Sequence, residues 1–498
     1  MPESATRQRV SAALEQLSST NLYIDGEWVA ATDGVTLETV DPATEEPITS
    51  VAAAQAEDID AAVSAAREAF HEWRDIDPAK RGRIVYRIGQ LIRDELDDLA
   101  ALESLDQGKP LSQARSDMTG AARYFEYYAG AADKLEGRSI PVGTGQVDYT
   151  VREPYGVSGQ ITPWNFPANL LARGVAPALV AGNAIVVKPA EQTPLSSLRL
   201  AELCTEAGVP DGVVNVVPGF GDPAGQALTE HEDIDQITFT GSVPTGQHIM
   251  ETAAETVTPV TLELGGKNPA IVFADANLET AAEWITTGIF TNAGQICSAT
   301  DRVLVHESVH DELVDEIVEI AASTSIGPGP EDEDMGPVVS EEQREKITSY
   351  IDVGIKEGAT LETGGEELDR DGYFVDPAVF TDVDPDMRIA REEIFGPVLS
   401  VLSFKDEDEA VEIANDSDYG LVAGVFTSDI DRAHRFARTL EAGNVYVNQW
   451  FGDTNQTPFG GYKQSGIGRE KGLAALDSYL QTKNIAINVK NNADSPSS

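Results

Sequence analysis

The feature that most constrains the fold is a regular alternation of short apolar runs and longer amphipathic segments within residues 157–242. The runs "GVSGQIT", "NAIVVKP", "GVVNVVPG" and "DQITFTGS" predict strands, and "NLLARGVAPALVAG" and "PLSSLRLAELCTEAG" predict the helices that connect them. Strands joined through helices form parallel sheets, which bind ligands beyond the carboxyl ends of their strands. A second alternation runs through "NPAIVFA", "DRVLVHES" and "GLVAGVFTS". We therefore predict an α/β protein with two such domains and a cleft between them.

The N-terminal third adds strands and helices to this plan. Residues 24–54 predict short strands with hairpin turns at Asp25-Gly26 and Asp33-Gly34, because both dipeptides favour positive φ. Residues 56–135 have helical periodicity, and the segment 81–107 predicts one helix that stops at Gly108-Lys109-Pro110.

Nothing in the sequence predicts a membrane anchor. The N-terminus lacks the apolar core of a signal peptide. The longest apolar stretch, residues 174–187, is interrupted by Pro177 and Asn183 and falls short of the about 18–20 residues that a membrane span needs. We expect a cytoplasmic protein with no membrane partner and a disordered tail at 490–498.

The charge balance is strongly acidic: 84 Asp and Glu oppose 35 Lys and Arg, which gives a net charge of −49 and a pI near 4.2. A hydrophobic content of 41% is too high for a disordered chain, so the charge must be tolerated in a folded one. At about 1 M salt the screening length falls to roughly 3 Å, and self-repulsion largely vanishes. We expect adaptation to a high-salt, halophile-like cytoplasm and no nucleic-acid partner.

The chain has two cysteines, too few for a disulfide framework. Cys204 falls on the apolar face of a predicted helix, which indicates core packing. Cys297, in "TNAGQICSAT", has small neighbours that would let a substrate carbonyl approach, and a helix beginning after it would lower the pKa of its thiol. The alternative is a small hydrophobe that fills a gap.

Four further motifs contain polar residues next to predicted strands. Gly241, in "FTGSVPTG", opens a helix whose amides suit a pyrophosphate. Lys188 and Glu191, in "VVKPAEQTP", follow an apolar strand and can reach a ribose. Glu263, in "LELGGKNPAIV", suits a general base, and Asn165, in "TPWNFP", a stiffly held oxyanion donor. Each has a structural alternative: a turn glycine, solvated charges, a strand-edge carboxylate and a turn-forming amide.

These pieces occur together and in order, with "VPGFG", "EEIFGPV" and "PFGGYKQSGIGRE". From about Leu22 to Val489 the chain resembles the NAD(P)-dependent, non-phosphorylating aldehyde dehydrogenase family. The resemblance implies a Rossmann-like parallel-sheet cofactor domain, a second α/β catalytic domain and a small β oligomerisation arm, assembled as a homodimer or homotetramer. The implied boundaries are 1–131 and 153–265 for the cofactor domain, 266–464 for the catalytic domain, and 132–152 and 465–489 for the arm and C-terminal strand.

The resemblance also implies a division of labour among side chains. Cys297 attacks the aldehyde to form a thiohemiacetal, whose oxyanion Asn165 and the Cys297 amide hold. Glu263 activates the water that hydrolyses the later thioester, and Glu470 lies along the water and proton path. The implied cofactor contacts are Thr162, Trp164, Lys188, Glu191, Gly219, Gly241, Ser242, Gly246, Leu264, Glu393 and Phe395. Because a carboxylate at Glu191 would repel a 2′-phosphate, NAD is expected over NADP, which stays an alternative; no metal is expected.

The substrate stays open between several aldehydes. Arg173 resembles the arginine that relatives use for carboxylated semialdehydes, such as those of succinate and 2-oxoglutarate, although a surface or interface charge is the alternative. Trp450 and Phe451 could enclose the quaternary ammonium of betaine aldehyde, and Asp453 beside them suits a cation. The activity could instead be that of a CoA-acylating enzyme or of a broad-specificity aliphatic enzyme. The presence of Glu263 favours hydrolysis to the free acid.

Overall fold

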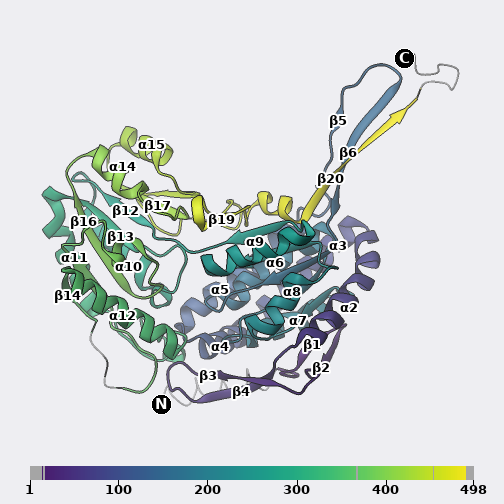
Figure 1. The fold of residues 1–498 in the computed structure, drawn as a ribbon, viewed down its shortest axis with the longest axis horizontal. Helices are drawn as coiled ribbons and strands as arrows, with labels where there is room; N and C mark the ends of the chain where they lie inside the picture. The colour runs from purple at the N-terminus through teal and green to yellow at the C-terminus, as the bar shows by residue number, and fades with distance from the viewer. Residues whose placement is uncertain (1–13, 15–16, 366–367, 369, 453, 490–498) are drawn as a thin grey trace.

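The computed structural model describes residues 14, 17–365, 368, 370–452 and 454–489. Figure 1 shows two α/β lobes side by side, with a narrow β arm that projects from one of them. Within the described ranges, no helix combines the length and the apolar character that crossing a bilayer requires. The predicted tail at 490–498 and Asp453 lie outside the described residues.

The first lobe is built on a sheet whose described strands run in the order β19-β11-β10-β7-β8-β9-β1-β2. Its parallel centre is β7 (Val157–Ile161), β8 (Ala184–Lys188), β9 (Val214–Val216), β10 (Gln236–Thr240) and β11 (Val260–Glu263). The edge strands β1 (Leu22–Ile24), β2 (Glu27–Val29) and β19 (Gly466–Ile467) are antiparallel. The predicted α/β class is confirmed, and the sheet is mixed at its edges.

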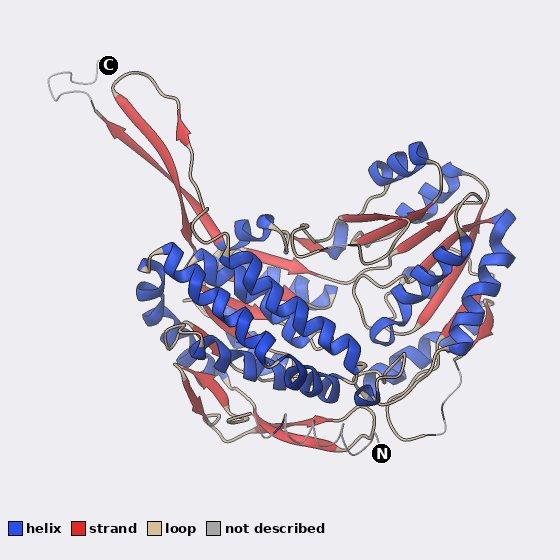
Figure 2. Ribbon diagram, turned by 180° about the vertical axis from the view of Figure 1, so that it is seen from behind, coloured by secondary structure: helices blue, strands red, loops and turns tan. Residues whose placement is uncertain are grey.

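Helices cover this sheet, as Figure 2 shows from behind. They are α2 (Ala56–Asp75), α3 (Pro78–Asp94), α4 (Leu96–Gln107), α5 (Leu111–Ala129), α6 (Pro167–Ala181), α7 (Leu195–Glu206), α8 (Gln226–Glu230) and α9 (Val243–Thr256). Strand β8, "AIVVK", is buried along its whole length, which is typical of a parallel strand covered on both faces. Helix α6 begins with Pro167 in its first turn and ends at Gly182, whose φ of 101° suits a left-handed cap.

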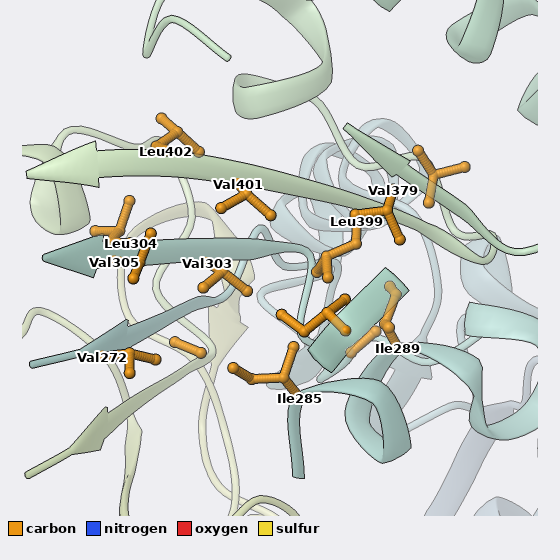
Figure 3. Packing of buried hydrophobic residues seen from close by; sticks show 14 of the residues in the cluster. Val272, Ile285, Ile289, Val303, Leu304, Val305, Val379, Leu399, Val401 and Leu402 are labelled. Carbon is orange, nitrogen blue, oxygen red and sulfur yellow. The ribbon is translucent and has the colours of Figure 1, made fainter. Parts of the chain in front are cut away.

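The second lobe has a sheet in the order β14-β15-β16-β13-β12-β17-β18 among the described strands. The strands are β12 (Pro269–Val272), β13 (Arg302–His306), β14 (Thr360–Thr363), β15 (Ala378–Thr381), β16 (Val398–Phe404), β17 (Val422–Phe426) and β18 (Asn444–Val447). The helices are α10 (Leu278–Phe290), α11 (His310–Ser323), α12 (Glu341–Glu357), α13 (Arg388–Arg391), α14 (Glu407–Asn415) and α15 (Ile430–Thr439). Figure 3 shows aliphatic side chains of α10, among them Ile285 and Ile289, close to those of the sheet. This packing excludes water from both faces of the central strands.

Two local predictions need correction. Asp25 and Gly26, at φ of 53° and 76°, form the predicted two-residue hairpin between β1 and β2. Asp33-Gly34 connects β2 to β3 (Thr36–Val40), which pairs with β4 (Pro47–Ala52) instead, so this turn is no hairpin. The predicted helix 81–107 is interrupted at Glu95, where φ is −106° and ψ is 17°. Gly108, at φ of 94°, ends α4 as predicted.

The arm is a three-stranded sheet of β5 (Ser139–Ile140), β6 (Gln146–Pro154) and β20 (Leu480–Asn488). Strand β20 pairs antiparallel with β6, from Leu480 opposite Pro154 to Asn488 opposite Gln146. The stretch before β20 belongs elsewhere: β19 extends the first sheet, and the side chain of Tyr479 is buried in the first lobe. The C-terminal segment therefore joins the arm at Leu480 and not at 465, because Gly466–Ile467 pair with the first sheet and Tyr479 packs in the first lobe.

Candidate active site

A cavity of about 510 Å³ lies between the two lobes. It opens where the parallel strands of the first sheet end, as expected for a sheet of this kind. Its walls are formed by Ser116, Asp117, Pro163, Trp164, Asn165, Phe166, Asn169, Leu170, Arg173, Thr240, Gly241, Ser242, Glu263, Gly265, Thr291, Ile296, Cys297, Ser298, Gln343, Lys346, Glu393, Phe395, Phe451, Phe459 and Lys471. The loop after β7, the turn after β10 and the end of β11 therefore meet the cysteine loop of the second lobe here.

Cys297 lies on the loop between α10 and β13, and that loop is held at several main-chain points. The amide Nδ2 of Asn268 donates to the Cys297 carbonyl at 2.9 Å, and the indole of Trp450 donates to the Ser298 carbonyl at 2.9 Å. Gly294 has a φ of 72°, and a Cβ there would collide with the main chain of Gly396. A side chain at this position has no room, so a glycine at 294 is a packing requirement of the cysteine loop.

The electrostatic environment of Cys297 differs from the prediction. No helix begins after it, since the next regular element is β13. Burial raises the pKa of the Cys297 thiol to about 12, and the charge of Arg173 opposes this rise only partly. The expected lowering by a helix start is therefore wrong, and any activation must come from nearby charges. Cys204 is buried in the core beside the first sheet, and the prediction of core packing is confirmed.

Asn165 connects the loop after β7 to the cysteine loop. Its side-chain Nδ2 donates to the carbonyl of Gln295 at 2.8 Å, and the residue is buried. Its own carbonyl accepts from Lys109 Nζ at 2.9 Å and from Asn292 Nδ2 at 3.1 Å. The amide therefore faces the cysteine loop with its main chain anchored. This is the stiffness that an oxyanion donor requires.

Lys109 anchors this loop, a role that the sequence analysis missed. Its ammonium is buried between the carboxylates of Glu103, at 3.3 Å, and Asp117, at 2.6 Å. It also lies 4.1 Å from the centre of the Phe166 ring. In the sequence Lys109 stood only between a helix-ending glycine and a proline, and no local signal marked it as buried. Its carboxylate partners are residues of α4 and α5 that only the fold brings together.

Glu263 ends β11 and lies deep in the cavity wall. The side chain is 3% exposed, and neither carboxylate oxygen has a hydrogen-bond partner among the described residues. Burial raises the pKa of Glu263 well above its ordinary value, and the charge of Arg173 opposes the rise most strongly. A buried carboxylate without hydrogen-bond partners has the basicity that a general base needs.

Arg173 and Glu470 form a buried ion pair behind Glu263. The Arg173 Nε faces a Glu470 carboxylate oxygen at contact distance, and Arg173 Nη2 lies 3.8 Å from Glu263 Oε2. Both partners are almost fully buried. The alternative of a helix-surface charge at Arg173 is therefore wrong. Glu470 does not line the cavity itself; it meets the cavity wall through its ion pair with Arg173 and through main-chain hydrogen bonds with Phe459.

The opposite end of the cavity has features that fit a dinucleotide. Ser242 caps α9 by accepting from the Thr245 amide at 3.4 Å, which leaves the helix start facing the cavity beside Gly241. A Cβ at Gly241 would collide with the ring of Phe239. A Cβ at Gly246 would come 2.7 Å from the side chain of Leu264. At both glycines a neighbouring side chain therefore lies directly against the backbone, which leaves no room for a Cβ.

Charged groups flank this end. The Glu393 carboxylate accepts from the Gly266 amide at 3.0 Å, and burial raises its pKa to about 7. Lys188 Nζ donates to the Gly219 carbonyl at 2.7 Å and lies 3.7 Å from Glu191 Oε2. The carboxylate of Glu191 is about one third exposed and borders a separate shallow hollow next to β3. This carboxylate is therefore accessible to ribose hydroxyls.

The structure brings most of the expected residues to one place, with some exceptions. Six of the residues expected to contact the cofactor do not line the main cavity: Thr162, Lys188, Glu191, Gly219, Gly246 and Leu264. Trp164 and Phe395 line it and meet edge to face at 5.3 Å. Phe451 also lines it, whereas Trp450 is fully buried and supports Ser298. The expected placement of Trp450 beside the substrate is therefore wrong, because its indole fills the space next to Gly288 and Gly424.

Comparison with known proteins places this geometry in context. The model of the aldehyde dehydrogenase family matches residues 28–485. A putative aldehyde dehydrogenase, DhaS, of Bacillus subtilis is 48% identical over 473 residues, which cover 94% of this chain and 96% of the relative. A mitochondrial aldehyde dehydrogenase of Leishmania tarentolae is 48% identical over 467 residues, 93% of this chain and 94% of the relative.

Solved structures agree with the sequence relatives. The NAD+ complex of an aldehyde dehydrogenase from Bacillus cereus is similar with a TM-score of 0.95 and 48% identity, over 97% of this chain and 99% of that one. A betaine aldehyde dehydrogenase from Staphylococcus aureus, in complex with NAD+, is similar with a TM-score of 0.95 and 42% identity, over 98% and 99% of the two chains.

Proposed function

The chain belongs to the aldehyde dehydrogenase family, and from this premise we propose that it oxidises an aldehyde to the free carboxylic acid with NAD+. The observation that carries the proposal is the meeting of a thiol, an amide and a carboxylate on the walls of one cavity. These groups belong to Cys297, Asn165 and Glu263. They supply a nucleophile, an oxyanion donor and a base, the three functions that aldehyde oxidation to an acid requires.

In the first half of the proposed reaction, the Cys297 thiol loses its proton to solvent, and its sulfur attacks the aldehyde carbon to form a C–S bond. The carbonyl oxygen becomes an oxyanion, to which the Asn165 amide and the Cys297 main-chain amide donate. Bound NAD+ supplies the hydride acceptor. When the carbon loses hydride and the C=O bond re-forms, the product on Cys297 is a thioester.

In the second half, Glu263 accepts a proton from water, whose oxygen attacks the thioester carbon. The C–S bond breaks, the carboxylic acid leaves, and the Cys297 thiolate takes up the proton that Glu263 had accepted, which regenerates both groups. The buried carboxylate of Glu263, whose oxygens have no hydrogen-bond partner among the described residues, supports this role. A CoA-acylating enzyme would pass the acyl group to a thiol and would have less need of this base, so Glu263 favours hydrolysis.

The cofactor proposal is NAD in preference to NADP. The accessible carboxylate of Glu191 next to Lys188 can accept from ribose hydroxyls, and it would repel a 2′-phosphate. The start of α9, where Ser242 is the N-cap and Gly241 lines the cavity, offers main-chain amides to the pyrophosphate. In this arrangement Glu393 and Phe395 would hold the nicotinamide ribose.

For the substrate, we propose an uncharged aldehyde. The walls near Cys297 include Phe166, Leu170, Ile296, Phe451 and Phe459, which offer apolar surface to the carbon chain. The carboxylated semialdehydes would need Arg173 for their distal carboxylate, but it already faces two carboxylates.

Betaine aldehyde is the second candidate, because the solved structures at 42% identity include a betaine aldehyde dehydrogenase. The aromatic enclosure expected for its cation would lack Trp450, which is fully buried, and would rest on Phe451. This loss favours the uncharged aldehyde.

We also propose a homodimer or homotetramer in a high-salt cytoplasm. The arm exposes apolar side chains at Ile140, Val142, Val147, Ile487 and Val489, which a partner subunit would cover. Figure 1 shows the arm standing away from its own lobes, where a second copy can reach it. Light scattering of the wild type and of an Ile487→Asp variant tests the assembly.

The reaction is tested by aldehyde-dependent NADH absorbance, with and without CoA. The panel contains propanal, betaine aldehyde, succinate semialdehyde and 2-oxoglutarate semialdehyde. We expect the highest kcat/KM with propanal and no stimulation by CoA. A CoA requirement would overturn the hydrolytic half, and no NADH from any aldehyde would overturn the proposal.

A further inference from the structure

We propose that Arg173 is a positioning residue for Glu263: its guanidinium, anchored by Glu470, orients the carboxylate of Glu263 and favours its ionised form for thioester hydrolysis. The inference rests on the proposed function, because it assigns Arg173 a part in the second half of that reaction. It replaces the expectation that Arg173 reads a carboxylate on the substrate.

The geometry places Arg173 between two carboxylates. Its Nε pairs with Glu470, and its Nη2 lies 3.8 Å from Glu263 Oε2. The guanidinium also stacks over Phe459, with Cζ 4.7 Å from the ring centre. An aromatic face on one side and an ion pair on the other fix the orientation of the side chain. The remaining edge of the guanidinium therefore points to Glu263 from a fixed position.

The charges around Glu263 make Arg173 its principal cation. Burial raises the pKa of Glu263, and the negative charge of Glu470 raises it further. Three cations lower the pKa of Glu263, and Arg173 has a stronger effect than Arg469 or Lys471. The Cys297 thiol faces the same space. Arg469 is turned outward, donating to the carbonyls of Gly461 and Gly468. Among these cations Arg173 is therefore the buried one, in an environment where a single charge is weakly screened.

The same arrangement explains why a substrate anion would be poorly placed at Arg173. One guanidinium already faces two carboxylates, so a further anion at Arg173 would lie close to other acidic groups. A third carboxylate would compete with Glu263 for Nη2 and would leave the base unpaired. Arg173 lines the cavity, but at 6% exposure it leaves little of the side chain for a ligand.

The test compares Arg173→Met and Arg173→Lys with the wild type, using propanal and NAD+. Arg81→Met is the matched control, since Arg81 is also buried but donates to main-chain carbonyls such as that of Val180, far from the cavity. We expect Arg173→Met to keep a burst of about one NADH per subunit while kcat falls roughly 100-fold, the lower range for loss of a general base. The acidic limb of its kcat–pH profile should move to higher pH. Arg173→Lys should restore part of the lost kcat and move the acidic limb part of the way back.

If Arg173 recognises the substrate and does not position Glu263, the same variants give a different result. If Arg173→Met raises KM for succinate semialdehyde alone, with kcat and the acidic limb for propanal unchanged, then Arg173 reads the substrate and the inference is overturned. A shift of the acidic limb in Arg81→Met would also overturn it, because the effect would then be a general consequence of losing a buried arginine.

A second variant, Glu470→Gln, should shift the acidic limb in the opposite direction, and it covers the case in which Arg173→Met does not fold. Glu470→Gln keeps the shape but removes the charge that raises the pKa of Glu263 and competes for the guanidinium. We expect its acidic limb to move to lower pH, and an unmoved or raised limb would overturn the inference. A wild type that makes no NADH refutes the proposed function and this inference together, whereas an active wild type with unmoved limbs refutes the inference alone.

Discussion

The side-chain amide of Asn165 donates a 2.8 Å hydrogen bond to the carbonyl of Gln295, two residues before Cys297. This bond joins the loop after β7, in the first lobe, to the cysteine loop of the second. The distance between the Asn165 amide and the Cys297 thiol is therefore set by the packing of the two lobes. Substitution of either residue tests whether this arrangement supports catalysis.

Asn165→Ala removes the side-chain oxyanion donor. We expect kcat to fall about 10²–10³-fold, equivalent to about 3–4 kcal/mol, because one preorganised donor has this value in a dry site. Asn169→Ala is the control, since Asn169 lines the same cavity but donates to the Asp117 carbonyl at 3.1 Å. A loss smaller than tenfold in the Asn165 variant would contradict its role.

Cys297→Ala abolishes aldehyde-dependent NADH formation, whereas Cys204→Ala, a change inside the core, leaves kcat near that of the wild type. The thiol pKa of about 12 also predicts the pH dependence of alkylation by iodoacetamide in the free enzyme. Because the thiolate fraction rises about tenfold per pH unit below the pKa, the rate should rise without a plateau through pH 9. A plateau near neutrality would show a thiol activated in the resting enzyme.

Glu263→Gln separates hydride transfer from hydrolysis. The variant should form about one NADH per subunit in a rapid burst and then stall at the thioester, since an amide cannot take the proton of water. Stopped-flow absorbance measures the burst, and mass spectrometry of the quenched enzyme detects the acyl group on Cys297. Steady turnover at the wild-type rate would exclude Glu263 as the base.

Glu191→Ser tests the choice of cofactor. Removing the carboxylate relieves its repulsion of a 2′-phosphate and loses its bonds to the ribose. The ratio of kcat/KM for NAD+ to that for NADP+ should fall at least about tenfold, a change of about 1.4 kcal/mol. Glu255→Ser, which removes an exposed carboxylate from α9, should leave the ratio unchanged. An unchanged ratio in the Glu191 variant would show that other residues discriminate between the cofactors.

Molar salt should stabilise the folded protein. With a net charge of −49, self-repulsion at low ionic strength favours unfolding, and screening over roughly 3 Å at about 1 M salt removes most of it. The Tm should rise steadily between 0.1 and 2 M KCl, as followed by circular dichroism. A flat or falling Tm would contradict adaptation to high salt.

Much of this molecule could be predicted from short segments. The apolar runs at β7, β8 and β10, separated by helical segments, predicted the parallel centre of the first sheet, because the packing of strands buried on both faces demands such sequences. The chemical groups of the site could also be predicted from the sequence. Cys297, Asn165 and Glu263 each lie in a short motif whose residues indicate the chemistry.

What only the tertiary structure decided was which neighbours those residues have. The sequence by itself could not tell that Trp450 is buried or that Lys109 anchors the Asn165 loop. It also could not tell that Arg173 faces two carboxylates or that burial raises the pKa of Cys297. Burial and ion pairing depend on groups that lie far apart in the chain and meet only in the folded state, whereas the chemistry of a side chain is present in its residue type.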